Sequence, residues 1–337
     1  MITYIHVGYP KAGSTTLQKR LFALHPEIIN LGLYPTNNIG NSVDGPNLDE
    51  ICRKVPYLYD PRIAELYRRL SRTSGLEFDQ SAVRALWEGI AQDYVLAQPG
   101  FPQATTVLSH ESLTSGRFSN PEVVEKARRV RQVFGQSKVL LMIRFQPSML
   151  VSLYRDHPFD PRTLEYRKRP VTFPEWLEID LNREWLSLSH TLLFDTMTRV
   201  YEALFGSENL LVLPLEMLRH DLQRAAQYLS DFLNIDACKT FELLNREPEN
   251  TGISVSGNSY RMTRARIAPL LKWLHPFKTP LKRLDSYLFS QFKKRGTTAS
   301  IVIPDKYKEK LAALYSQENA RLSKRRGLSL KELGYDI

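Results

Sequence analysis

Residues 4 to 18 read Tyr-Ile-His-Val-Gly-Tyr-Pro-Lys-Ala-Gly-Ser-Thr-Thr-Leu-Gln, and this stretch decides the fold. An apolar, β-branched run stops at Gly8, and a loop with a second glycine, Gly13, follows. Hydroxyl residues then open a helical pattern of regularly spaced leucines. A strand, a glycine loop and a helix start together predict an anion cradle, because backbone N–H groups and the positive end of the helix dipole converge there.

The loop differs from that of nucleoside-triphosphate-binding proteins, whose pattern is G-x-x-x-x-G-K-[ST]. Gly8 and Gly13 have that spacing, but Ser14 stands where the lysine belongs, and the lysine is at position 11 instead. No apolar strand pattern ends in an aspartate suited to magnesium. A lysine-bearing cradle with no expected metal suits a phosphosulfate better than a triphosphate.

The P-K-x-G-[ST]-T core of this loop resembles the 5′-phosphosulfate loop of sulfotransferases that use 3′-phosphoadenylyl sulfate (PAPS). The resemblance implies that Lys11 stabilises the bridging oxygen of the leaving phosphate, with adenosine 3′,5′-bisphosphate as the spent cofactor. It also implies a set of cofactor-binding residues in the loop: Lys11, Ala12, Gly13, Ser14, Thr15 and Thr16. The alternative for Lys11 is a solvated loop charge.

A second segment supports the same resemblance. Residues 139–143 are a continuous apolar run, as expected of a strand buried in a parallel sheet, and Arg144 follows at its carboxyl end. Ser152 lies eight residues later. In the family, an arginine and a serine so spaced bind the 3′-phosphate of PAPS, and a guanidinium suits a phosphate physically. The commonest family string has proline at the place of Gln146, although bacterial members often carry glutamine there.

Two neighbouring residues are candidates for the base that takes the acceptor's proton. His110 and Glu111 follow the apolar strand pattern of residues 105–109, at the carboxyl end of another expected sheet strand. Cytosolic small-molecule sulfotransferases place a histidine after such a strand, whereas many bacterial and glycan-directed members use a glutamate. Glu111 is favoured because the string as a whole resembles the bacterial glycan-type branch. The alternative is that both residues only orient the loop.

Three other groups of residues have more than one interpretation. Lys294 and Arg295, in the tract 293–296, resemble a late basic loop that closes over the 3′-phosphate in several branches of the family, but a charge run is usually a solvated face. His6 lies inside the first strand and is expected to pack in the core. Core packing is also the expectation for Tyr154 and Trp176.

Composition limits the class of protein. The chain has 337 residues, 42% of them hydrophobic, and a formal net charge of +10. The excess of positive charge favours anionic ligands without choosing among cofactor, acidic glycan, nucleic acid and membrane surface. The two cysteines, Cys52 and Cys238, form neither a disulfide framework nor a metal motif, so no metal is expected. The sequence shows no signal peptide or membrane-spanning run, which predicts a cytoplasmic and, from the resemblance, bacterial protein; peripheral membrane contact stays open.

The order of the expected elements predicts an α/β fold, a P-loop-like, doubly wound and mostly parallel sheet with helices on both faces. We expect a single domain over residues 1–337, with insertions near 33–100 and 157–187. The expected elements outside the motifs are a short strand within 26–33, helices within 61–97, a helix over 120–134, a helix over 192–205, a strand over 209–213, a helix over 221–233 and a final helix over 305–322.

The sequence thus predicts a metal-free sulfotransferase that moves a sulfuryl group from PAPS to a hydroxyl. A bacterial polysaccharide or glycolipid is the first choice of acceptor, a small natural product the second and a protein tyrosine the third. A nucleotide kinase of the same sheet type is the alternative enzyme. A basic protein that binds glycan or nucleic acid is the alternative without catalysis, although no nucleic-acid motif is present. The oligomeric state does not follow from the sequence.

Overall fold

The computed structural model describes residues 3–34, 55–96, 105–114, 123–156, 172–183, 187–246 and 301–337. The chain divides into two compact units. The first comprises Met1–Gln146, Thr191–Glu247 and Ala312–Ile337, and the second comprises Pro147–His190 and Pro248–Leu311. The expectation of a single domain with two insertions stays a prediction.

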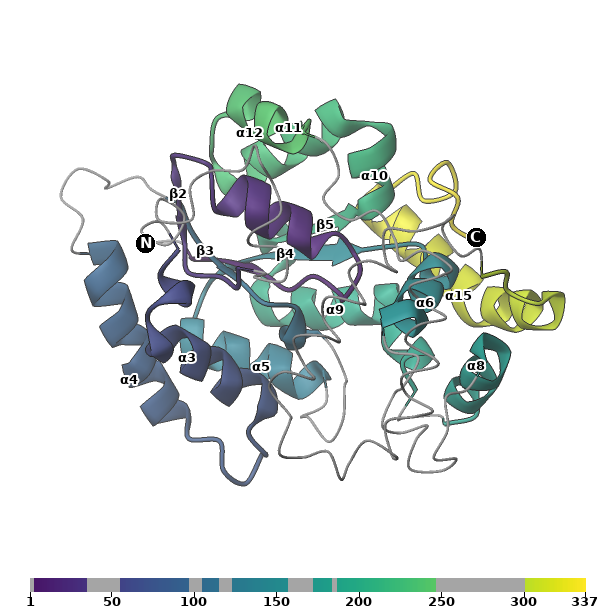
Figure 1. Ribbon diagram of the computed structural model, residues 1–337, viewed down its shortest axis with the longest axis horizontal. Coiled ribbons are helices and arrows are strands. Elements are labelled where there is room, and N and C mark those ends of the chain that lie inside the picture. The colour runs from purple at the N-terminus through teal and green to yellow at the C-terminus, as the bar shows by residue number, and fades with distance from the viewer. Residues whose placement is uncertain are drawn as a thin grey trace, which may run out of the picture. The chain divides into compact units, whose positions relative to one another are not determined.

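The first unit is built on a parallel sheet, and the expected fold class is confirmed. Its described strands lie in the order β2-β3-β1-β4-β5, and every pairing is parallel (Figure 1). The strands are β1 Thr3–His6, β2 Ile28–Asn30, β3 Thr105–Ser109, β4 Lys138–Ile143 and β5 Leu210–Pro214. Because neighbouring strands that are parallel need crossover connections, each strand is joined to the next through helices.

The strands form where the sequence is rich in apolar and β-branched residues. In β4 every residue after Lys138 is buried, and β1 and β3 are buried throughout. Both faces of this sheet are therefore covered, as is usual for parallel sheets. The register pairs His6 of β1 with Ser109 of β3, so that the ends of these two strands lie side by side.

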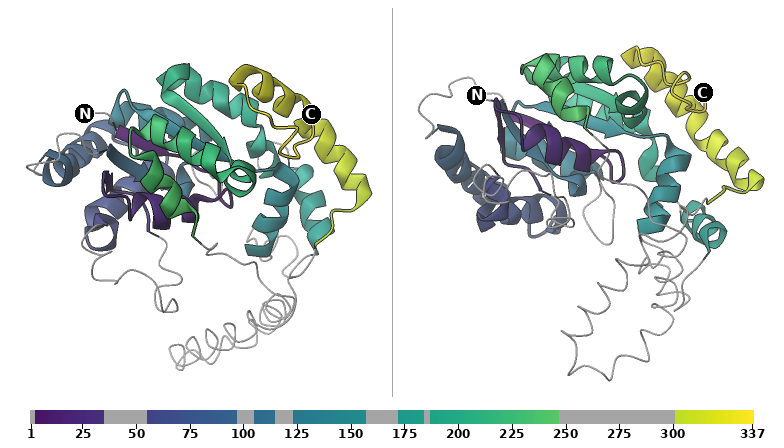
Figure 2. Two further views of the ribbon diagram at one scale, coloured as in Figure 1. Left: turned by 90° about the horizontal axis from the view of Figure 1, so that it is seen from above. Right: turned by 45° about the horizontal axis from the view of Figure 1, so that its top comes forward.

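Helices cover the sheet of the first unit on both faces (Figures 1 and 2). One group contains α3 Pro61–Arg72, α4 Gln80–Ala91, α5 Val123–Phe134 and α9 Phe194–Phe205. Each of these helices packs against the next one in this order, and α9 also packs against strands β4 and β5. The other contains the helical run α1 Ser14–Thr16 and η1 Leu17–Phe22, together with α10 Leu215–His220, α11 Leu222–Leu233 and α12 Ala237–Leu244. Short turns complete the unit: η2 Pro56–Leu58, η3 Gln92–Leu96, η4 Glu111–Leu113 and η7 Ser207–Asn209.

The second unit contains most of α6 Gln146–Asp156, α8 Phe173–Leu181, η6 Ser189–Leu192 up to His190, and the first turns of α15 Asp305–Arg326. Aromatic packing joins its helices. The ring of Tyr154 lies 5.3 Å from that of Phe173 and 5.8 Å from that of Trp176, between centroids. All three side chains are buried, which confirms the core role expected for Tyr154 and Trp176. The Tyr307 hydroxyl of α15 donates to Glu178 of α8 at 2.7 Å.

Most element boundaries agree with the sequence patterns to within one or two residues. The last helix was expected over 305–322 and to be ended by Gly327, with residues 324–326 as its positive end, and it runs over Asp305–Arg326. It stops there because Gly327 adopts a left-handed backbone conformation, with φ of 63°, that ends helices readily. Residues 35–54, 157–171 and 247–300, which include parts of the expected insertions and of the late basic region, lie outside the described residues.

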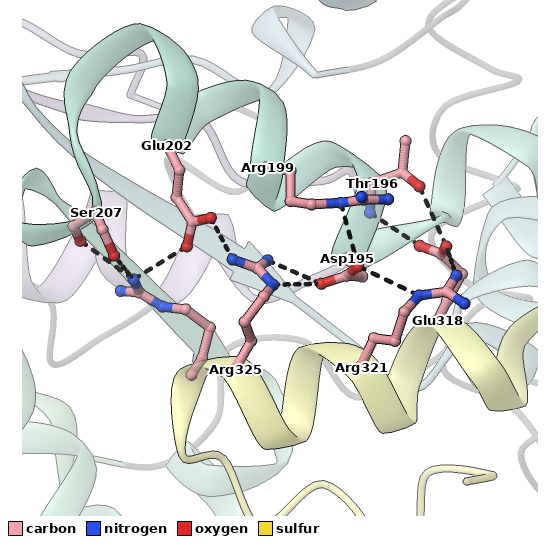
Figure 3. Close-up of polar contacts among 9 residues, drawn as sticks. Asp195, Thr196, Arg199, Glu202, Ser207, Glu318, Arg321 and Arg325 are labelled. Atoms are coloured by element: carbon pink, nitrogen blue, oxygen red, sulfur yellow. Dashed lines mark hydrogen bonds and ion pairs between the residues drawn. The ribbon is translucent and has the colours of Figure 1, made fainter.

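Ion pairs attach the end of α15 to α9 (Figure 3). The Asp195 carboxylate of α9 is buried and contacts three guanidinium groups: Arg325 Nη2 at 2.8 Å, Arg199 Nε at 3.3 Å and Arg321 Nε at 3.5 Å. Two turns further along α9, Glu202 pairs with Arg325 and with the next arginine of α15. The last turn of α15 thus carries the arginines that pair with α9.

We expect Asp195→Asn to lower the free energy of unfolding by about 1–3 kcal/mol, because a buried charged acceptor is replaced by a neutral one while its partners remain. The cost stays below that of breaking a fully buried pair because the three arginine side chains are 33–56% exposed and keep part of their hydration. Urea unfolding measures the change. Glu242→Gln, which removes an exposed pair with Lys239, is the control and should leave the midpoint in place. Equal midpoints for Asp195→Asn and wild type would contradict this account of the cluster.

Candidate functional site

The loop between β1 and the first helical run forms one wall of the candidate site, at the carboxyl edge of the sheet. Its first part stays beside β4, since the Val7 amide donates to the Leu140 carbonyl at 2.9 Å and the Tyr9 amide to Met142 at 3.3 Å. The Ala12 amide then donates back to the Tyr9 carbonyl at 3.1 Å, which closes a tight turn. The helical run begins directly after this turn, with Gly13 as its N-cap.

The backbone of the loop is strained at the predicted catalytic residue. Lys11 has φ of 70°, and among the described residues other than glycine only Asn234 shares this left-handed conformation. Such a backbone costs a lysine of the order of 1–3 kcal/mol, and strain of this kind gathers at functional sites. Gly13 has φ of 92°, and a β-carbon there would come within 2.7 Å of Leu215 Cδ1. The loop conformation therefore depends on glycine at 13 and is imposed on lysine at 11.

Arg144 connects the end of β4 to this loop. Its Nη1 donates to the Lys11 carbonyl at 2.9 Å, so the structure brings these two predicted site residues together. Two residues that the sequence reasoning missed lie beside it. The carboxylate of Glu216 accepts from the amide of Phe145 at 3.1 Å and from the hydroxyl of Tyr335 at 2.8 Å. Burial first, and then the Glu216 carboxylate, raises the pKa of Tyr335, so its hydroxyl remains a donor.

The base candidates lie in a short turn that is attached to the loop. Residues 111–113 form η4 directly after β3, and the Thr114 hydroxyl at the end of this turn donates to the Gly8 carbonyl at 2.9 Å. His110 is the N-cap of the turn, since its Nδ1 accepts from the Ser112 amide at 3.1 Å. Burial, with smaller contributions from Arg72 and Lys126, lowers the pKa of His110 to about 4. His110 is therefore neutral at pH 7.

The tautomer of His110 follows from this contact. A neutral imidazole has one donor and one acceptor nitrogen. Nδ1 lies 3.1 Å from the Ser112 amide nitrogen and 2.6 Å from the Ser112 hydroxyl oxygen, and with both groups donating to it the ring proton is assigned to Nε2. In this state His110 has no free lone pair with which to take a proton from an acceptor hydroxyl. Glu111, the first residue of η4, is the neighbouring group whose chemistry remains suited to a base.

The other predicted site residues are placed as follows. In the loop, Ala12 and Ser14 are buried, whereas Lys11, Gly13, Thr15 and Thr16 are half-buried. Ser152 is in α6 and belongs to the second unit, whereas Arg144 belongs to the first. Lys294 and Arg295 lie outside the described residues. The first unit thus brings together the loop, Arg144, His110 and Glu111.

The residues of the first unit fit an anionic group. The Ser14 hydroxyl and His6 Nε2 are buried without a hydrogen-bond partner, and both lie beside Gly8. The same loop contains a backbone turn and Lys11, and Arg144 contacts it. Backbone amides, a lysine and an arginine are the donors expected for a phosphate or sulfate ester. No group of three His, Cys, Asp or Glu side chains in the described ranges is placed to hold a metal ion. Within those ranges, no helix is both long and apolar enough to cross a bilayer.

Comparison with known proteins gives a fold match at low sequence identity. No protein-family model matches the sequence, and no curated protein does. The sulfotransferase of Alicyclobacillus acidocaldarius is similar in structure, with a TM-score of 0.51 and 14% identity over 99% of this chain and 98% of the other. The sulfotransferase domain of the Synechococcus PCC 7002 olefin synthase (0.36, 17%, 73% of this chain and 78% of the other) and a mouse sulfotransferase in complex with PAP (0.41, 13%, 98% and 88%) are more distant. The chain thus has a P-loop-like α/β fold that it shares with a sulfotransferase.

Proposed function

We propose that this protein is a sulfotransferase that moves a sulfuryl group from PAPS to a hydroxyl acceptor without a metal ion. The observation that carries the proposal is the loop at 8–16, in which Lys11 has a strained backbone conformation and Arg144, the residue after β4, donates to its carbonyl. The fold match agrees with this reading. Among acceptors, a polysaccharide or glycolipid is preferred, followed by a small natural product and then a protein tyrosine. A cytoplasmic, bacterial setting belongs to the same proposal and rests on the sequence alone.

The residues of this chain have distinct roles in the proposed reaction. PAPS would supply the sulfuryl group and an anionic leaving group. Loop residues Ala12 to Thr16 bind the 5′-phosphosulfate, and the Lys11 ammonium neutralises charge on the leaving phosphate. Arg144 binds the 3′-phosphate, and Ser152 and the basic pair Lys294 and Arg295 are proposed to join it. Positioning and charge stabilisation then account for most of the acceleration.

Glu111 is proposed as the base that accepts the proton of the acceptor hydroxyl. His110, the alternative, is assigned to holding the turn, because its Nδ1 caps η4 and its Nε2 carries the proton. The Thr114 hydroxyl at the end of this turn donates to the Gly8 carbonyl, and this hydrogen bond joins the turn that carries the proposed base to the loop.

We expect Glu111→Gln to lower the turnover number by about 10²–10⁴, the usual contribution of a positioned general base, and to remove the acid limb of the pH–rate profile. The matched control is His110→Asn, because an asparagine oxygen is also a good N-cap acceptor and can replace Nδ1. His110→Asn should stay within a few-fold of wild type. Steady-state sulfation at several pH values measures both. If His110→Asn abolishes turnover and Glu111→Gln does not, the two roles must be exchanged.

The acceptor class is tested by incubating the protein with PAPS and with separate polysaccharide, glycolipid and small-metabolite fractions, and detecting sulfate esters by mass spectrometry. Transfer without added metal supports the proposal. Phosphate transfer from ATP that requires magnesium would support the kinase alternative instead. Binding that falls steeply with salt and does not respond to PAPS would favour a basic binding protein.

A further inference from the structure

Three buried polar side chains meet behind the loop. His6 of β1, Gln18 of η1 and Ser109 of β3 are each at most 1% exposed. The Ser109 oxygen lies 2.7 Å from His6 Nδ1 and accepts from the Gln18 side-chain nitrogen at 2.9 Å. Burying polar groups costs free energy unless they are hydrogen-bonded, so the hydrogen bonds within this cluster have to offset the desolvation of its members.

We assign the direction of the hydrogen bonds from the Gln18 amide, placed with its nitrogen toward Ser109. A serine hydroxyl has one proton to donate, and the Ser109 oxygen already accepts from Gln18. Among the contacts of the described residues, His6 Nδ1 is the one acceptor for that proton. Burial lowers the pKa of His6 to about 3, so the ring is neutral. With Nδ1 acting as acceptor, the ring proton of His6 is on Nε2.

That Nε2–H group points to the loop. His6 Nε2 and the Ser14 oxygen are both buried without a hydrogen-bond partner. A β-carbon built on Gly8 would lie 2.6 Å from each of them. The two atoms therefore lie within twice that distance of one another, on the same side of Gly8. The two atoms are not hydrogen-bonded to each other, but one water molecule can bridge a separation of this size.

We propose that His6 is a positioning residue: its Nε2–H donates through one water molecule to the Ser14 oxygen, and so turns the Ser14 proton toward an anion bound in the loop. This inference rests on the proposed function. The order of donation is Gln18 to Ser109, Ser109 to His6, His6 to Ser14 and Ser14 to the anion. Every member is neutral, and each bond polarises the next. The absence of a side chain at Gly8 is what lets the middle step form.

The first test is the protonation of His6 in the wild-type protein without ligand. Nitrogen-15 NMR of the imidazole, with His6 assigned by its contact to the Phe22 ring, should show a neutral ring with the proton on Nε2. The ring should remain neutral down to about pH 4. A proton on Nδ1 instead would overturn the proposal, and this measurement needs neither a variant nor an active enzyme.

The second test uses calorimetric binding of adenosine 3′,5′-bisphosphate and of adenosine 3′-monophosphate, which lacks the 5′-phosphate. We expect His6→Asn, whose side chain reaches Ser109 but not Ser14, to weaken binding of the bisphosphate about tenfold. His6→Gln, whose amide reaches further, should restore most of that binding. In a Ser14→Ala background His6→Asn should have no further effect, and binding of the monophosphate should not change in any variant.

The outcomes separate this inference from the proposed function. If the wild type does not bind the bisphosphate, the proposed function fails and the inference fails with it. If the wild type binds but His6→Asn costs the same with and without Ser14, the role assigned to His6 is wrong while the cofactor assignment stands. Thermal unfolding of each variant shows whether it is folded. If His6→Asn is unfolded, comparison of His6→Gln with Ser14→Ala and the NMR result decide the question.

Discussion

Lys11→Ala should slow the release of adenosine 3′,5′-bisphosphate from PAPS about 10²–10³-fold in single-turnover reactions with excess enzyme. The proposed role of Lys11 is to stabilise charge that develops on the leaving phosphate, and loss of one such group typically costs this much in rate. The assay does not require that the natural acceptor be known, because water can replace it. The binding of adenosine 3′,5′-bisphosphate should weaken by less than the rate falls, since the charge is greatest in the transition state.

The backbone makes alanine a clean replacement at this position. Lys11 has a left-handed φ of 70°, and alanine is penalised there much as lysine is, so the substitution isolates the ammonium group. Stability in urea should therefore change little. Lys19→Ala, on the helical run that follows, is the matched control and should react at the wild-type rate. A Lys11→Ala enzyme with unchanged single-turnover rate would mean that its ammonium is only a solvated loop charge.

Arg144→Ala should weaken the binding of adenosine 3′,5′-bisphosphate by about 2–5 kcal/mol, the cost of removing one partner of a desolvated charge pair. This corresponds to about 30-fold or more in Kd. Two effects add here, because Arg144 is the proposed ligand of the 3′-phosphate and also donates to the Lys11 carbonyl at 2.9 Å. Calorimetric titration without metal measures the change.

Two comparisons separate these effects. Arg144→Lys keeps a positive charge but loses the planar fork, so it should recover only part of the affinity. Adenosine 5′-monophosphate lacks the 3′-phosphate, and its weaker binding should be reduced far less by Arg144→Ala. Equal losses for the two nucleotides would show that Arg144 acts only by shaping the loop.

The sheet could be predicted because its strands are short runs rich in apolar and β-branched residues. Residues 105–109 were expected as a strand and form β3, and the runs before Arg144 and after residue 208 form β4 and β5. Parallel strands that are buried on both faces produce this pattern directly in the sequence. The position of Arg144 at a strand end, and hence its contact with the loop, follows from the same pattern.

The polar contacts behind the loop could not be predicted in the same way. His6 and Ser109 are neighbours because β1 pairs with β3 in one register, and residues so far apart in sequence carry no local signal of that pairing. His6 was expected to be a packed core residue, and it is buried, but its hydrogen bonds depend on tertiary structure. The same holds for Glu216 and Tyr335, which come to Arg144 from distant segments.

The proposed cofactor is tested most directly by titrating the wild-type protein, without metal, with adenosine 3′,5′-bisphosphate, and in parallel with ATP and magnesium. We predict saturable binding of the bisphosphate that does not require magnesium, and much weaker binding of ATP. Binding of ATP with magnesium and none of the bisphosphate would contradict the account, and would mean that the loop at 8–16 serves a nucleotide kinase.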